Sequence, residues 1–150
     1  MTGLRPGAFR LIHEVAVRFT DLDAAGHVHH SVPLLYWEEA RIRYWRIVAG
    51  RDGAADPDYV IGQITLTYHQ RIHYPATLRA GVRTTRLGRS SFDMEYALWD
   101  REDRLLCSGA STQVVYDYDA ARPRPLEPET RRRIEDYEGD FRGAPGPAPG

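Results

Sequence analysis

One long apolar segment, followed by strand-like segments with short connections, limits the folds open to this chain. Residues 31–49, SVPLLYWEEARIRYWRIVA, repeat apolar side chains at roughly helical spacing, and Gly50 is a residue type that commonly ends a helix. Ser31 is the expected N-cap, and Pro33 is tolerated in the first turn. Because apolar residues cover more than one narrow stripe, we expect other structure to wrap around this helix.

The remaining apolar residues alternate with polar ones, as in half-buried strands. One such segment lies before the helix, over residues 11–19, where Val15, Val17 and Phe19 share a face. Four more follow the helix, between residues 59 and 117, and their links are too short for crossover helices. The sequence therefore predicts an antiparallel meander. Its turns are expected at Tyr74-Pro75, at Gly88-Arg89 and at residues 100–103.

A single sheet must cover its apolar face, and only the 31–49 helix is long and apolar enough to do so. We therefore predict an α+β fold in which a curled antiparallel sheet wraps around one long helix, the hot-dog architecture. One helix leaves part of the sheet uncovered, so a homodimer or homotetramer with edge-to-edge strand pairing is expected. Residues 9–138 form the predicted single domain, between a flexible tail at 1–8 and a disordered Pro/Gly tail at 139–150. Within that domain, residues 129–139 are expected to form a short polar or frayed helix.

Composition excludes several classes of partner. The net charge of −1 provides no global field for nucleic acid or an anionic membrane, and no apolar run approaches the ~18 residues of a membrane span. The single cysteine, Cys107, excludes an intramolecular disulfide and fits a reducing compartment. The first ten residues lack the apolar core of a signal peptide, so the expected location is the cytoplasm.

The loop TDLDAAGHVHH, residues 20–30, carries the chemistry. It ends where the helix begins, and the free N–H groups of a helix N-terminus stabilise a developing oxyanion. Asp21 and Asp23 are the only carboxylates in the loop, and either could act on an ester or thioester carbonyl as general base or nucleophile. Gly26 allows the chain to turn and to approach a ligand. These features predict a hydrolytic site that needs no metal and no other cofactor.

Other uses of these residues stay open. An aspartate before a helix is often only a cap or turn residue. His27, His29 and His30 could bind zinc as an extended H-x-H pair, although the three- or four-residue spacing of helical zinc ligands is absent. Cys107 lies in a strand pattern and is interpreted as a small buried hydrophobe. No GxGxxG or GxxxxGK[ST] motif supports nucleotide binding.

At these residues the chain resembles a known family. The stretch VRFTDLDAAGHVHHSVPLLYWEEAR, residues 17–41, is similar to the signature of the 4-hydroxybenzoyl-CoA thioesterase family of hot-dog acyl-CoA thioesterases. That signature reads roughly R-(F/Y)-x-D-x-D-x-x-G-H-V-N-N, followed by an aromatic-rich stretch and E-x-x-R. The resemblance extends over about residues 10–117 and includes the turn within LGRSSF. The matching positions are Arg18, Phe19, Asp21, Asp23, Gly26, His27, Val28, Glu38 and Arg41.

The resemblance implies a role for several residues. Asp23 would be the catalytic carboxylate, the backbone amide near His30 would polarise the thioester, and His27 would orient the loop. Around the second turn, Arg86 and Arg89 would bind the phosphates of coenzyme A, as guanidinium groups do well. Ser90 or Ser91 would contact the pantetheine. One departure is clear, because His29-His30 stands where the family often has Asn-Asn.

The predicted function is hydrolysis of an acyl-CoA or aryl-CoA to the free acid and coenzyme A, with acyl-CoA as the small-molecule partner. Tyr36 and Leu35 of the helix, with strands of a neighbouring subunit, are expected to line the acyl pocket. Alternatives are an acyl-carrier-protein substrate, a non-catalytic acyl-CoA binder and a metal-binding protein. A hot-dog dehydratase is disfavoured, because the Asn-Pro step of D-x-N-P-x-H is absent after Asp23.

Overall fold

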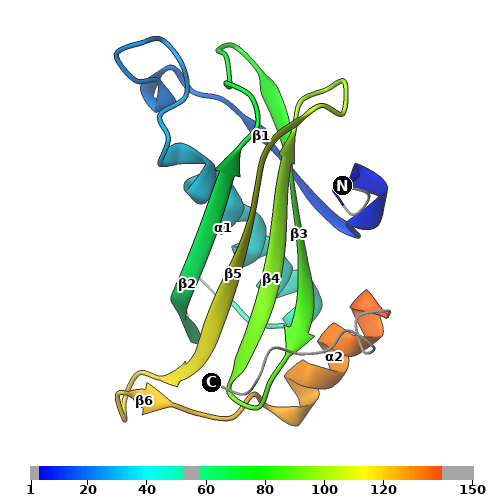
Figure 1. Ribbon diagram of the computed structural model, residues 1–150. Helices are drawn as coiled ribbons and strands as arrows, with labels where there is room; N and C mark the ends of the chain where they lie inside the picture. The colour runs from blue at the N-terminus through cyan, green and yellow to red at the C-terminus, as the bar shows by residue number, and fades with distance from the viewer. Residues whose placement is uncertain (1–3, 53–57, 140–150) are drawn as a thin grey trace.

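The structure is a computed structural model that describes residues 4–52 and 58–139 (Figure 1). Five long strands and two α-helices account for most of it, with short helical turns between them. The elements are η1 Pro6–Ala8, β1 Leu11–Ala16, η2 Phe19–Asp21, α1 Val32–Tyr44, η3 Trp45–Ala49, β2 Tyr59–Tyr68, β3 Thr77–Leu87, β4 Ser91–Trp99, β5 Leu105–Asp117, β6 Arg122–Pro123 and α2 Pro128–Glu138.

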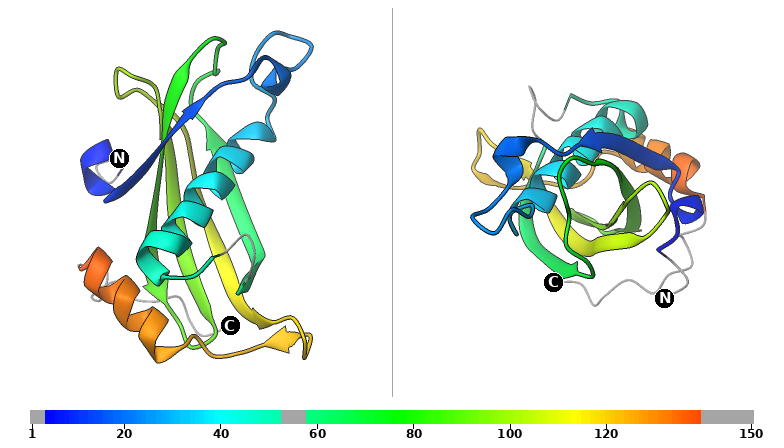
Figure 2. Two further views of the ribbon diagram at one scale, coloured as in Figure 1. Left: turned by 180° about the vertical axis from the view of Figure 1, so that it is seen from behind. Right: turned by 90° about the horizontal axis from the view of Figure 1, so that it is seen from above.

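The strands form one antiparallel sheet in the order β1-β3-β4-β5-β2, with β6 paired to the end of β5. β1 and β2 flank α1 in the sequence, yet they occupy opposite edges of the sheet, so α1 runs across its concave face. Seen from above, the sheet curls around this helix (Figure 2). The predicted α+β architecture, a curled antiparallel sheet around one long helix, is confirmed.

Large aromatic side chains fill the space between helix and sheet. Trp37 of α1 stacks on Tyr96 of β4 with ring centroids 5.2 Å apart, and Trp45 stacks on Phe92 at 5.1 Å. All four side chains are at most 1% exposed. Gly109 of β5 makes room for the helix, because a Cβ there would lie 2.8 Å from the Trp37 ring. This packing fixes the position of α1 and therefore of the loop that precedes it.

The helix has the predicted ends. Ser31 is at the N-cap position, although its side chain makes no capping hydrogen bond. The last turn, Trp45–Ala49, widens to π-helical hydrogen bonding and ends at Gly50, whose φ of 73° favours glycine. No helix in the described part of the chain is long and apolar enough to cross a membrane.

The outer face of the sheet also carries an apolar cluster, and the first residues cover it. Phe9 contacts Trp99 edge-on with ring centroids 5.2 Å apart, and the Trp99 indole donates to the Leu4 carbonyl at 2.9 Å. Residues 4–8 therefore differ from the expected flexible tail, since they include the turn η1 and pack on β4. The expected disordered tail lies outside the described residues from position 140 onward.

Two other local expectations differ from the structure. Phe19 was expected to share the buried face of the first strand, but β1 ends at Ala16 and Phe19 is 73% exposed in the turn η2. The C-terminal segment is a full helix, α2, in which Ile134 is completely buried. Glu138 of α2 accepts hydrogen bonds from the Tyr44 hydroxyl at 2.6 Å and from the Thr84 amide at 2.7 Å. These bonds join α2 to α1 and to β3.

Candidate active site

The loop before α1 is a tight turn held by its own backbone. Leu22 and Val28 pair as an isolated antiparallel bridge. Inside it, the Asp23 amide donates to the His27 carbonyl at 2.7 Å, and the Gly26 amide donates to the Asp23 carbonyl at 3.1 Å. Gly26 has a φ of 81°, which side chains other than glycine rarely adopt. The glycine expected to turn the chain therefore does so.

The two aspartates of the loop have different environments. Asp21 is 6% exposed, and its Oδ2 accepts hydrogen bonds from the Tyr36 hydroxyl at 2.7 Å and from the Arg18 amide at 2.9 Å. Its backbone carbonyl accepts the His29 amide at 2.8 Å. Asp21 therefore fastens the loop to α1. Burial, and next the bond to Asp21, raise the pKa of the Tyr36 hydroxyl.

Asp23 has one fixed oxygen and one available oxygen. Its Oδ1 accepts the Ala25 amide at 2.9 Å and the His27 amide at 3.2 Å, while Oδ2 has no hydrogen-bond partner in the described part of the chain. The His27 N–H, with a smaller contribution from the Ala25 N–H, holds the pKa of the Asp23 carboxyl below its usual value. The group is therefore ionised at neutral pH, as a nucleophile or general base must be.

At the helix tip, the backbone amide of His30 has no partner in the described part of the chain. The amides on either side are occupied, because the His29 N–H bonds to Asp21 and the Ser31 N–H bonds to the His29 ring at 3.2 Å. The His30 N–H makes no hydrogen bond within residues 4–52 and 58–139. An unpaired N–H at the positive end of a helix can donate to a carbonyl oxygen that gains negative charge.

The end of β2 forms the side of the candidate site opposite the Asp23 loop. The Tyr68 hydroxyl donates to the His30 carbonyl, so the last residue of β2 holds the helix tip in place. Between them lies a cleft of about 470 Å³. The lining residues are Asp23, His27, Val28, His30, Pro33, Tyr68, His69, Gln70, Arg71 and Ile72. Sequence reasoning missed the 68–72 wall, because polar residues after a strand carry no local signal of a site.

The histidines of the HVHH run do not converge on a metal position. The His29 and His30 rings lie against each other at 4.0 Å, and the His29 Nδ1 bonds to the Ser31 hydroxyl at 2.8 Å. The His27 ring contacts His73 edge-on at 5.3 Å. Among residues 4–52 and 58–139, no group of three His, Cys, Asp or Glu side chains could hold a metal ion. The metal-binding alternative therefore has no support from these residues.

The structure brings only part of the expected site together. Asp23, His27 and His30 line one cleft, and Gly26 turns their loop. Tyr36 is 1% exposed and does not line that cleft, whereas Leu35 is 51% exposed on the helix surface. The three other expected binding residues lie at the β3–β4 turn, beside α2 and at the opposite end of the sheet from the loop (Figure 1). They are Arg86, Arg89 and Ser91.

Arg86 is also occupied. Its Nε and Nη2 bond to the two carboxylate oxygens of Asp93 at 2.7 and 3.1 Å, and its Nη2 also donates to the Ser91 hydroxyl at 3.0 Å. The 11-residue strand β3 separates this turn from the Asp23 end of the sheet, and it is roughly 36 Å long at about 3.3 Å per residue. Within one copy of the chain, these residues and Asp23 cannot contact the same small group.

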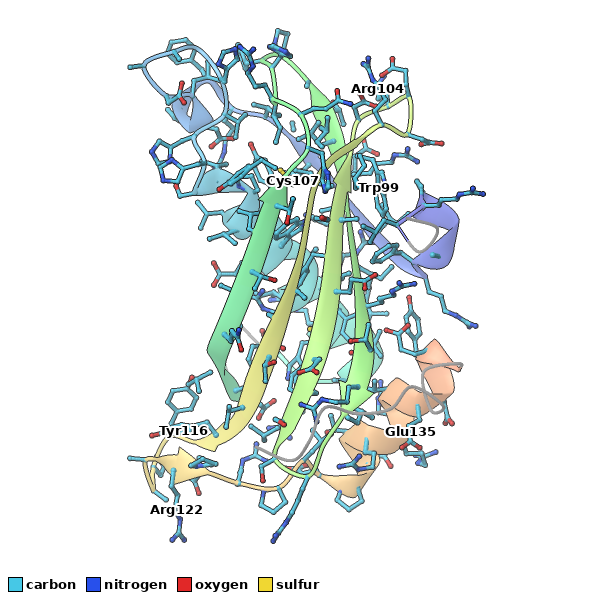
Figure 3. All side chains as sticks on the ribbon, viewed as in Figure 1. Trp99, Arg104, Cys107, Tyr116, Arg122 and Glu135 are labelled. Carbon is cyan, nitrogen blue, oxygen red and sulfur yellow. The ribbon has the colours of Figure 1, made fainter. Side chains whose placement is uncertain are left out.

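Cys107 is not placed to react. It is fully buried on β5, inside the curled sheet (Figure 3). Burial raises the pKa of its thiol to about 12, so the reactive thiolate is scarce at neutral pH. The interpretation of Cys107 as a small buried hydrophobe agrees with this environment.

Comparison with known proteins gives a consistent result. The sequence model of the thioesterase-like superfamily matches residues 17–134. A solved thioesterase from Thermus thermophilus, complexed with coenzyme A and Zn, is 34% identical, with a TM-score of 0.79 over 93% of this chain and 98% of that one. The uncharacterized protein YsmA of Bacillus subtilis (strain 168) is 27% identical over 107 residues, which are 71% of this chain and 73% of YsmA.

A more distant structure shares the fold. The DHNA-CoA thioesterase from Staphylococcus aureus has a TM-score of 0.77 over 86% of this chain and 91% of that one. At 18% identity, this likeness concerns the fold alone.

Proposed function

Because this chain belongs to the thioesterase-like superfamily, we propose that it hydrolyses an acyl-coenzyme A to the free acid and coenzyme A in the cleft that contains Asp23. The chain is a thioester hydrolase, so the non-catalytic alternative is set aside. Coenzyme A in the 34%-identical Thermus thermophilus structure supports the choice of thiol. One observation carries the proposal. The ionised Asp23 and the unpaired His30 amide border the same cleft.

The geometry supports a short reaction path. The thioester carbonyl oxygen accepts the His30 N–H, and the free oxygen of Asp23 faces the carbonyl carbon. In one route Asp23 removes a proton from water, the hydroxide adds to the carbonyl carbon, and the thiolate of coenzyme A leaves. In the other, Asp23 adds directly, the thiolate leaves, and water hydrolyses the resulting anhydride. Both routes need the ionised carboxylate, and both place the oxyanion at the His30 N–H.

The direct test is a panel of acyl-CoA substrates assayed by release of the free thiol. Short, medium and long acyl chains are compared with benzoyl and phenylacetyl groups. At least one substrate is expected to reach a kcat/KM of roughly 10⁴ M⁻¹s⁻¹ or more, the lower range of ordinary enzymes. No thiol release from any member would contradict the proposal. The best acyl group is then presented on an acyl carrier protein, and faster hydrolysis there would favour the carrier-protein alternative.

The free edge of β2 supports the expected self-association. β2 pairs with β5 on one side and ends the strand order on the other. None of its ten residues, YVIGQITLTY, is charged or proline, although exposed edge strands are usually protected by such residues. Ile61, Ile64 and Tyr68 are exposed along it. We propose that β2 pairs with the β2 of a second copy, as a homodimer or within a homotetramer.

Replacing Ile64 by arginine is expected to shift the protein toward monomer, because a charge would be buried at the paired edge. Light scattering during size-exclusion chromatography measures the mass across a dilution series. Ala120→Arg, in an exposed turn after β5, is the matched control and is expected to keep the wild-type mass. Equal masses for Ile64→Arg and wild type at every concentration would argue against pairing through β2.

A further inference from the structure

A second cleft shares three lining residues with the one that contains Asp23. It has a volume of about 580 Å³ and lies between residues 70–78 and the β4–β5 hairpin. Gln70, Arg71 and Ile72 line both clefts. The two clefts therefore adjoin along residues 70–72.

The second cleft contains positive charge that no residue in the described part of the chain neutralises. Its arginines are Arg71, Arg101 and Arg104, its acidic residues are Asp100 and Glu102, and His73 also lines it. Both acids are directed to Arg104, with Arg104 Nε 2.6 Å from Asp100 and Arg104 Nη2 3.6 Å from Glu102. Asp100 also accepts the backbone amides of residues 102 and 104.

Arg71 and Arg101 are exposed, and their side chains make no hydrogen bond or ion pair with any residue that the structure describes. Arg71 stands at the junction of the two clefts, and Arg101 is on the hairpin beside it. The hairpin lies at the same end of the sheet as the Asp23 loop, as Arg104 shows in Figure 3. Two unpaired guanidinium groups next to a catalytic cleft form a site suited to phosphate oxygens.

We propose that the second cleft binds the phosphate groups of a phosphopantetheine thioester, with Arg71 and Arg101 as the phosphate ligands. The inference rests on the proposed function, which puts the thioester at Asp23. The pantetheine arm then passes along residues 70–72, and Arg71 is the first of the two arginines that the phosphates contact. This assignment replaces the expected role of Arg86, which is bonded to Asp93 at the other end of the sheet.

The test compares one acyl group on three thiols, which are coenzyme A, phosphopantetheine and pantetheine. In the double variant Arg71→Ala/Arg101→Ala, kcat/KM for acyl-CoA is expected to fall about 10- to 100-fold through KM, because charged hydrogen bonds are lost. Hydrolysis of acyl-pantetheine is expected to fall much less, so that the double variant loses the preference for acyl-CoA over acyl-pantetheine. Arg122→Ala removes an exposed arginine at the far end of the sheet (Figure 3) and is the matched control, expected to leave all three substrates unchanged.

Comparison of acyl-phosphopantetheine with acyl-CoA distinguishes two sources of the bound phosphate. A loss with both acyl-phosphopantetheine and acyl-CoA would support the inference and assign Arg71 to the phosphate shared by coenzyme A and carrier proteins. A loss with acyl-CoA alone would support it for the phosphates of the nucleotide. If the double variant keeps the full preference for acyl-CoA over acyl-pantetheine, the inference is wrong. If the Arg89→Ala variant loses that preference instead, the phosphate site lies at the β3–β4 turn.

Calorimetric binding of coenzyme A and of pantetheine gives a readout without catalysis. Wild type is expected to bind coenzyme A more tightly than pantetheine, and the double variant is expected to bind the two equally. A wild type that hydrolyses none of the three thioesters would contradict the proposed function, and the calorimetric difference would still decide the phosphate site. Normal hydrolysis with equal binding in wild type and the double variant would overturn only the phosphate site.

Discussion

Replacing Asp23 by asparagine is expected to lower kcat by roughly 10²–10⁴-fold, the usual contribution of a positioned acid–base group. The asparagine oxygen can still accept the Ala25 and His27 amides, so the loop is expected to keep its shape. What disappears is the negative charge on the free oxygen. Steady-state kinetics with the best acyl-CoA of the panel measures the effect, and KM is expected to change little.

Asp117→Asn is the matched control for this change. Asp117 accepts two backbone amides in the turn after β5, at 3.0 and 2.9 Å, so it makes the same kind of turn at the far end of the sheet. Wild-type kcat is expected for this variant. Undiminished hydrolysis by Asp23→Asn would remove Asp23 from the mechanism and would leave the His30 amide without a catalytic partner.

The pH dependence of kcat/KM provides a second view of Asp23. Its folded-state pKa lies below the ordinary 3.8, so the carboxylate stays ionised as the pH falls from neutral to about 4. The loss of activity that comes from protonating Asp23 is therefore expected only below pH 3.8. An acid limb between pH 5 and 6 that vanishes in Asp23→Asn would contradict this, and circular dichroism at each pH confirms that the protein is folded.

The largest expected effect on stability is that of Asp58→Ala. Asp58 is 5% exposed, and its carboxylate accepts hydrogen bonds from Arg51 at 2.6 Å, Arg124 at 3.0 Å and the Trp45 indole at 2.8 Å. Alanine would leave a buried indole N–H and two half-buried guanidinium groups without this partner. The free energy of unfolding is expected to fall by about 2–4 kcal/mol, equivalent to a Tm lower by roughly 10 °C.

Urea unfolding followed by circular dichroism measures that loss. Asp136→Ala removes an exposed carboxylate of α2 that lies 3.9 Å from Arg132, and a change below about 0.5 kcal/mol is expected for it. Equal stability of the two variants would mean that the Asp58 cluster contributes no more than a surface ion pair. The position matters for the fold because Asp58 joins the end of the long helix to the start of β2 and to the segment before α2.

The fold was predictable because its signals are local. Alternation in β3 and β4, together with links of a few residues, favours antiparallel pairing of β3, β4 and β5, as the structure has it. The predicted meander of four strands is wrong for β2, which pairs with β5 at the far edge of the sheet and not with β3. Phe19 illustrates where this reasoning stops. It continues the alternation of β1, but β1 and β3 pair only up to Ala16 and Thr77, and a strand without a partner does not persist. The N-terminal residues were missed for a related reason, since Phe9 contacts Trp99, ninety positions along the chain.

The candidate site was predictable only where one loop carries it. Asp23, Gly26 and His30 lie within eight residues, so the helix that follows fixes their relation to one another. The residues alone left Asp21 and Asp23 open, and only the family resemblance favoured Asp23. In the structure the Tyr36 hydroxyl donates to the buried Asp21, and Asp23 lines the cleft. Arg86 looked available because its charge is visible in the sequence. The register that sets it opposite Asp93 is visible only once the β3–β4 pairing is known.

Gly81 leaves room for two aromatic rings on the outer face of the sheet because it has no side chain. A Cβ at this position would lie 2.6 Å from the Trp99 ring and 3.0 Å from Phe9, so the missing side chain is the space that both rings occupy. Trp99 in turn holds the carbonyl of Leu4. Positions 81, 99 and 9 thus share one volume, and among relatives they should covary. Where position 81 gains a side chain, the tryptophan should give way to a smaller residue, and the attachment of the first residues to the sheet should be lost with it.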